Sequence, residues 1–171
     1  MKTAIAYFTR SGNTKIAAEK LKSKLEEHNI NADLIEIKPQ KKLGFLRAGR
    51  AGMKQDPLPI TNATFDLHDY EAIIVGVPVW AGKPAPYYKS FFDHAQHFEG
   101  KKAGVFVTQG GDNLDTTVDE AIQQYLSEHK LKTADFCLRL QMRKGKINCG
   151  EDHIETFLTR IFKEEKEEEE N

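Results

Sequence analysis

Three short runs of almost purely apolar residues, each followed by a polar stretch that contains glycine, constrain the fold of this chain most. They occupy 3–8, 72–79 and 103–108. A strand that is covered on both faces reads as such a solid run, which is typical of a parallel sheet between helices. Two further strand candidates, 32–37 and 134–142, contain charged residues and therefore fit the edges of that sheet.

Segments with helical periodicity separate these strands. Apolar residues recur every three or four positions after residue 14, and again within 86–98, 115–130 and 151–163. This alternation predicts an α/β fold with a doubly wound, five-stranded parallel sheet in the order 2-1-3-4-5, counted along the chain. We expect the stretch 38–55 between the second and third strands to form a solvated crossover that contains a frayed helix. The alternative is a basic patch for an acidic partner or a nucleotide phosphate, since the stretch holds six basic residues and no acidic one.

Composition narrows the function classes. The 171 residues suit one domain, expected over 1–163, followed by an acidic tail at 164–171. With 25 basic and 26 acidic residues, the chain lacks the basic excess of a general nucleic-acid binder. It has no membrane-spanning run or signal peptide, and its only cysteines, Cys137 and Cys149, form no disulfide framework. We therefore predict a cytoplasmic protein.

The most informative motif, TRSGNT at 9–14, lies between the first strand and the first helix. In the expected order, this loop is at the point where the strand order reverses, and doubly wound sheets bind ligands there. A helix N-terminus attracts phosphate, and Gly12 permits close approach of the backbone. Side-chain donors come from Thr9, Ser11, Asn13 and Thr14. The alternative is a capping cluster without a ligand.

The motif differs from other known phosphate-binding loops. It lacks the GxxxxGK[ST] pattern of a P-loop and the GxGxxG pattern of a dinucleotide fold. It also lacks a phosphatase cysteine, and no carboxylate follows the first strand as in a phospho-receiver domain.

A second loop, PVWAGKPAP at 78–86, follows the third strand on the other side of the same point. Prolines stiffen it, and Gly82 allows backbone conformations that other residues avoid. We expect Trp80 at the mouth, where a flat aromatic ligand could stack on it. The alternative is a rigid connection in which the indole packs on a neighbouring helix.

A third loop follows the fourth strand. Its residues Thr108 to Asn113 read TQGGDN, and the adjacent Gly110 and Gly111 free backbone groups to approach the edge of a ligand. Asp112 adds polar support, although the same residues also suit an ordinary turn.

Together, the three loops resemble those of the flavodoxin-like family of FMN-binding proteins, and the resemblance spans about residues 1–160. TRSGNT resembles the family's T-x-T-G-N-T phosphate loop, with Ser11 at the second threonine. PVWAGKPAP resembles the flavin-side loop of the oxidoreductase-like branch, and FVTQGG resembles the third loop.

The resemblance implies FMN as cofactor, no catalytic acid or base, and no metal. It implies that FMN is bound by Thr9, Arg10, Ser11, Gly12, Asn13, Thr14, Pro78, Val79, Trp80, Ala81, Gly82, Thr108, Gly110, Gly111 and Asp112. The Ala81–Gly82 peptide corresponds to the one that flips near flavin N5 in electron-transfer members. No aromatic residue stands between Thr108 and Leu114 to cover the second face of the flavin. That face is therefore expected to be open to a substrate.

Two roles stay open for such a flavoprotein: an electron carrier with a redox partner protein, or an NAD(P)H or quinone reductase with a small-molecule acceptor. A different class is a cofactor-free binding module that uses the basic segment 38–54. A third option is a nucleotide or phosphosugar binder. His94 and His97 form a weak candidate metal pair, for which two solvated histidines are the favoured interpretation, and we expect both cysteines to be inert.

Overall fold

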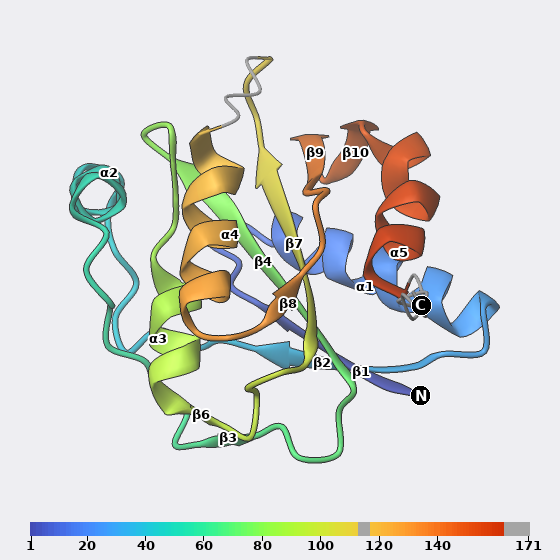
Figure 1. The fold of residues 1–171 in the computed structure, drawn as a ribbon. Coiled ribbons are helices and arrows are strands. Elements are labelled where there is room, and N and C mark those ends of the chain that lie inside the picture. Colours follow the sequence, from blue (N-terminus) through green and yellow to red (C-terminus); the bar gives the residue numbers. More distant parts are fainter. Residues whose placement is uncertain (113–116, 163–171) are drawn as a thin grey trace.

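The computed structural model describes residues 1–112 and 117–162, and in it one sheet runs through the centre of the molecule (Figure 1). The main path through the sheet has the order β10-β9-β7-β4-β1-β2, and on this path only β10 runs antiparallel to its neighbour. The strands are β1 (Lys2–Tyr7), β2 (Asn31–Glu36), β4 (Ala72–Trp80), β7 (Lys102–Gln109), β9 (Leu138–Arg143) and β10 (Lys146–Cys149). The five parallel strands therefore have the expected order 2-1-3-4-5.

The end of the sheet differs from the prediction. The segment 134–142 is not an edge strand, because β10 pairs with β9 on its outer side. Lys144 and Gly145 have φ values of 49° and 71°, as a type I′ turn requires, and they reverse the chain into a hairpin. The strand also begins later than expected, at Leu138, after a short strand β8 (Lys132–Thr133) that pairs with the start of β7.

Helices cover both faces of the sheet (Figure 1). Packing of α1 (Asn13–Glu27) and α5 (Ile154–Phe162) buries one face, where α1 contributes Leu21 and Leu25 to the core. Packing of α3 (Tyr87–His94) and α4 (Thr117–Glu128) buries the other face. The expected crossover contains a regular helix, α2 (Phe45–Lys54), which buries only Ala48 and Gly52.

The remaining elements are short: β3 (Phe65–Asp66), β5 (Lys83–Pro84), β6 (Ala95–Gln96) and a 3-10 turn, η1 (Glu151–His153). Among the described residues, no helix has the length and apolar character needed to cross a bilayer. The acidic tail at 164–171 and Asn113 of the third loop lie outside the described residues.

Candidate functional site

The loop between β1 and α1 exposes the donor end of a helix. Gly12 has a φ of 94° and precedes the first helical residue, and its N–H donates to Thr9 Oγ1 at 3.0 Å. The first helical hydrogen bond runs from the N–H of Ile16 to the carbonyl of Gly12 at 3.1 Å. The N–H groups of residues 13–15 therefore have no carbonyl partner within the helix, and they carry the positive end of its dipole.

The space in front of this helix end is open. A Cβ atom built on Gly12 would meet no heavy atom within 4 Å, and the first turn of α1 holds no acidic side chain. Ser11 is exposed, while Thr9, Arg10 and Asn13 are half-buried around it. The loop thus offers unpaired donors, no competing carboxylate in the helix's first turn and room for a group the size of a phosphate, which fits a phosphate monoester.

Thr14 connects this loop to the end of β7. Its hydroxyl lies 2.7 Å from the hydroxyl of Thr108, and the two residues are 1% and 2% exposed. We expected Thr14 to be an open donor, whereas it is buried in a contact between the first and third loops. This hydrogen bond sets the position of one loop relative to the other.

The second loop forms a hairpin that its sequence did not suggest. Trp80 pairs with Lys83 across a two-residue turn, in which Ala81 and Gly82 have φ values of 50° and 73°. These values match a type I′ turn, which joins antiparallel strands with little strain when glycine holds one position. Ala81 and Gly82 are exposed at the tip, and Pro78 and Val79 are partly buried below it.

The expectation that the indole of Trp80 is open for stacking is wrong in this structure. The side chain is 8% exposed, and its ring meets the edges of Phe8 and Tyr87 at centroid distances of 5.4 Å and 5.9 Å. Gly52 of α2 lies so close that a Cβ atom there would be 2.6 Å from the Trp80 carbonyl oxygen. The alternative from the sequence, an indole packed beneath a neighbouring helix, is what the structure has.

Tyr87, the first residue of α3, is also buried, and burial raises the pKa of its phenol. It packs on Phe8 at a centroid distance of 4.0 Å and so belongs to the support of the hairpin.

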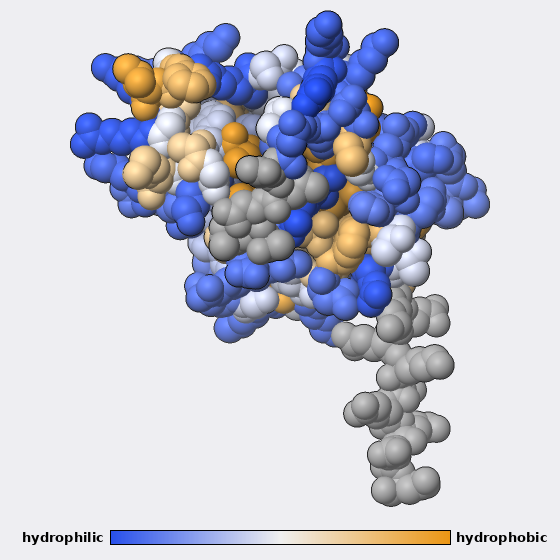
Figure 2. All heavy atoms as spheres, turned by 90° about the horizontal axis from the view of Figure 1, so that it is seen from above, coloured by the Kyte–Doolittle hydropathy of each residue, from blue (hydrophilic) through white to orange (hydrophobic). Residues whose placement is uncertain are grey.

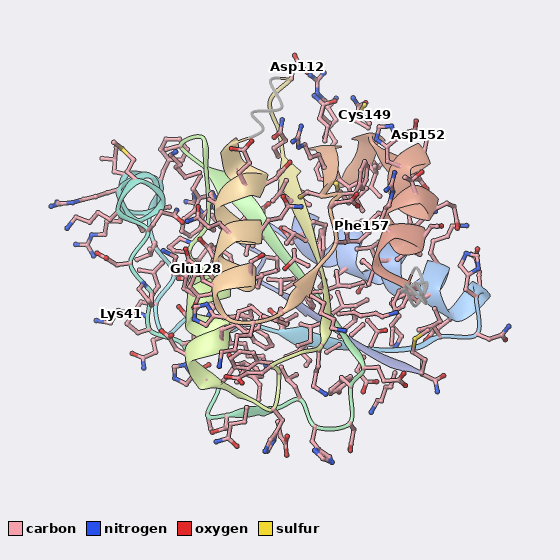
Figure 3. The ribbon with its side chains drawn as sticks, in the orientation of Figure 1. Lys41, Asp112, Glu128, Cys149, Asp152 and Phe157 are labelled. Atoms are coloured by element: carbon pink, nitrogen blue, oxygen red, sulfur yellow. The ribbon has the colours of Figure 1, made fainter. Side chains whose placement is uncertain are left out.

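The third loop is held by side chains that the sequence analysis did not select. Gln141 of β9 donates to the carbonyl of Gly111 at 3.3 Å and to Asp112 Oδ1 at 2.5 Å. Arg143 donates to the same oxygen at 2.6 Å, and Asn148 of β10 donates to Gln141 Oε1 at 2.6 Å. Asp112 projects at the tip of the loop (Figure 3). In the sequence, Gln141 shares the more polar side of its strand with Arg139, because apolar and polar residues alternate there, and this alternation is the only signal for the role.

Gly110 and Gly111 of this loop face open space, since a Cβ atom on either would meet nothing within 4 Å. Both residues are exposed, and the carbonyl of Gly111 already accepts hydrogen bonds from Gln109 and Gln141. The Thr14–Thr108 contact brings the base of this loop to the phosphate loop, whereas the second loop turns its aromatic side chain inward.

The other candidate residues have separate partners. His94 Nδ1 lies 2.9 Å from the carbonyl of Ser90, and His97 Nδ1 lies 2.9 Å from Asp66 Oδ1. Within 1–112 and 117–162, no group of three or more His, Cys, Asp or Glu side chains is placed to hold a metal ion. Burial raises the pKa of the Cys137 thiol well above its usual value, while Cys149 is exposed.

Residues 5–135 match the family model of NADPH-dependent FMN reductases. The chain is 28% identical over 113 residues to an NAD(P)H dehydrogenase (quinone) of Caulobacter vibrioides, covering 63% of this chain and 56% of that protein. It is 27% identical over 124 residues to the minor allergen Alt a 7 of Alternaria alternata, covering 68% and 61%. The chain thus spans somewhat more than half the length of these curated relatives.

Solved structures share the fold. A flavoprotein from Bacteroides eggerthii has a TM-score of 0.71 at 20% identity, and the match covers 94% of this chain and 97% of that protein's chain. A flavoprotein from Lactobacillus acidophilus in complex with FMN has a TM-score of 0.61 at 21% identity, covering 92% and 98%. With the family match over most of its length, the chain belongs to the NADPH-dependent FMN reductase family and is a flavodoxin-like, FMN-binding redox protein.

Proposed function

We propose that this protein is an oxidoreductase that takes electrons from NAD(P)H through FMN held by the three loops. The NADPH dependence of the family supports the choice of donor. The observation that carries the location of the cofactor is the open donor end of α1, where Gly12 leaves space in front of unpaired N–H groups. The phosphate of FMN would be held there by the N–H groups of residues 13–15, with Ser11 and Thr9 beside it.

Bound FMN supplies reversible one- and two-electron transfer, and the chain supplies its position and surroundings. The exposed backbone at Ala81–Gly82 and at Gly110–Asp112 would border the ring, together with Pro78 and Val79. Trp80 contributes indirectly, because its buried indole packs beneath the hairpin and supports it. The Thr14–Thr108 hydrogen bond keeps the phosphate loop in register with the third loop.

The side chains around the site provide no acid–base step in this proposal. The phenol of Tyr87, which packs beneath the second loop, is buried with a raised pKa and stays protonated at neutral pH. The chain would therefore contribute through binding, orientation and shielding of the cofactor.

Anaerobic stopped-flow mixing tests this proposal. The FMN-loaded protein is mixed with NADPH or NADH, and the absorbance of oxidised flavin is followed. We expect bleaching within seconds and saturation with increasing nicotinamide. If dithionite reduces the bound flavin but neither nicotinamide does so within minutes, the protein is not an NAD(P)H oxidoreductase.

A further inference from the structure

The helix α2 presents an unpartnered apolar face. Phe45, Leu46 and Met53 are 80%, 86% and 73% exposed, and they are three of the five large apolar side chains exposed in the described part of the chain. Figure 2 shows apolar groups gathered on the side of the molecule where α2 lies, surrounded by hydrophilic ones. Exposed apolar clusters of this kind mark interaction sites in a folded protein.

Cations surround this face. The segment 38–55 contains six exposed basic residues and no acidic one: Lys38, Lys41, Lys42, Arg47, Arg50 and Lys54. Within the described residues, none of these six cations lies within ion-pair distance of a carboxylate. The ion pairs in this part of the chain all involve other cations. In Figure 3, Lys41 points away from the sheet. A surface that carries this uncompensated charge attracts an acidic partner.

The inner side of α2 is rigidly attached, so its outer face is preorganised. Gly52 packs against the Trp80 carbonyl. Gln55, at the end of the helix, donates to the carbonyls of Gly52 at 2.5 Å and Pro84 at 2.7 Å, and accepts from the Tyr88 hydroxyl at 3.1 Å. A rigid surface loses little conformational entropy when a partner docks.

A hollow of 240 Å³ lies along α2, and a second one of 220 Å³ lies beside the segment that precedes the helix; both have Leu43 and Leu58 as walls. Three cations, Arg47, Arg50 and Lys54, and one carboxylate, Asp56, line the larger hollow, so its rim is positive on balance. An apolar floor with a charged rim is the usual anatomy of a protein–protein interface.

The surface also borders the flavin site. The guanidinium of Arg10, in the phosphate loop, lies 5.9 Å from the centre of the Phe45 ring. The opposite end of α2 reaches the hairpin of the second loop through Gln55 and Pro84. A partner seated on α2 would therefore lie beside the loops that hold the cofactor.

We propose that α2 and the basic residues around it form the docking surface for an acidic electron-transfer protein whose carboxylates ring an apolar patch. The proposal rests on the redox function proposed above. One NAD(P)H gives up two electrons and releases one proton, and two partner molecules each take up one electron. No bond forms between the partner and this protein.

Two other occupants fit less well. A second copy of this chain related by a two-fold axis would place the cations of both α2 surfaces against each other, which is repulsive. A flat anionic membrane would meet the exposed apolar side chains but would leave the two hollows unfilled.

The test measures electron transfer from the FMN-loaded protein, reduced beforehand with dithionite, to an acidic [2Fe–2S] ferredoxin. Chemical reduction separates docking from the NAD(P)H reaction, so either proposal can fail alone. We expect a saturable rate that falls as salt is added. Arg47→Glu/Arg50→Glu should lower the rate at low ionic strength by about tenfold or more. Leu46→Gln should weaken saturation without changing the salt dependence.

The control Lys22→Glu/Lys130→Glu makes the same change in net charge away from α2, and should retain the wild-type rate within about twofold. FMN affinity should be equal in all variants. Equal rates for the α2 variant and the control would overturn the proposal. So would binding to phosphatidylserine vesicles in preference to ferredoxin, or a micromolar dimer that Leu46→Gln dissociates.

Discussion

The buried hydrogen bond between Thr14 and Thr108 gives the sharpest energetic test of how the loops are joined. Valine is nearly isosteric with threonine, so Thr14→Val removes one hydroxyl without opening a cavity. The remaining hydroxyl then lies in a site that is 2% exposed, with its partner gone. Leaving a buried polar group unpaired costs about 1–3 kcal/mol, whereas replacing both partners with apolar groups can be nearly neutral.

We therefore expect each single variant, Thr14→Val and Thr108→Val, to lose about 1–3 kcal/mol of unfolding free energy. The double variant should lose clearly less unfolding free energy than the two single variants lose together. The difference, which is the coupling energy, should be about 1 kcal/mol or more. In a chain of this size, each kcal/mol corresponds to roughly 2–4 °C in Tm. Urea unfolding of the flavin-free proteins, followed by circular dichroism, measures all four corners of the cycle.

Thr3 supplies the matched control. Its hydroxyl is buried, and among the described residues it has no hydrogen-bond partner. Thr3→Val should therefore be neutral or stabilising, in contrast to the same substitution at Thr14. If the loss in the double variant equals the sum of the losses in Thr14→Val and Thr108→Val to within about 0.3–0.5 kcal/mol, the two hydroxyls are not coupled. That result would refute the account of the loop contact.

Three further outcomes follow. Gln141→Leu removes the donor that holds Gly111 and Asp112, so FMN affinity should fall by about tenfold, or 1.4 kcal/mol, in a fluorescence titration; unchanged affinity would show that the third loop holds its shape alone. With a thiol reagent, Cys149 should react at once and Cys137 only on unfolding, because burial disfavours its thiolate; two fast thiols would contradict this. Burial raises the pKa of Tyr125 from 10.0 to about 12, so the unfolded chain loses this proton first. Stability should then fall as the pH rises from 10 towards 12, and less steeply in Tyr125→Phe, as urea midpoints would show; equal slopes would argue against it.

Much of the sheet could be predicted because its signals are local. The solid runs that became β1, β4 and β7 record burial on both faces, and their order follows from that burial. The hairpin to β10 was missed because its only local signal is Lys144–Gly145, a short turn after a strand that already looked like an edge.

The position of α2 could not be read from its own residues. Its many cations suggested a frayed crossover, whereas the helix is held by Gly52 on the Trp80 carbonyl and by Gln55 on Pro84. These contacts join residues about thirty positions apart. The same packing buries the indole, which explains why the stacking role expected of Trp80 was wrong.

The loop after β1 was located more reliably, because its role depends on neighbouring residues. A polar, glycine-containing turn before a helix produces an open donor end wherever the strand and helix form. The support that Gln141 gives to the third loop depends on the register between β9 and that loop, which the sequence does not encode locally.

The most direct measurement is the quenching of FMN fluorescence by three proteins: wild type, Gly12→Val and Gly100→Val. Both glycines have positive φ and open space at the Cβ position, so the two substitutions impose similar backbone strain. We expect wild type and Gly100→Val to bind FMN alike, and Gly12→Val to bind at least about a hundredfold more weakly, or 2.7 kcal/mol, with an unfolding midpoint equal to that of Gly100→Val. Wild-type affinity in a folded Gly12→Val protein would contradict the docking of the phosphate on α1.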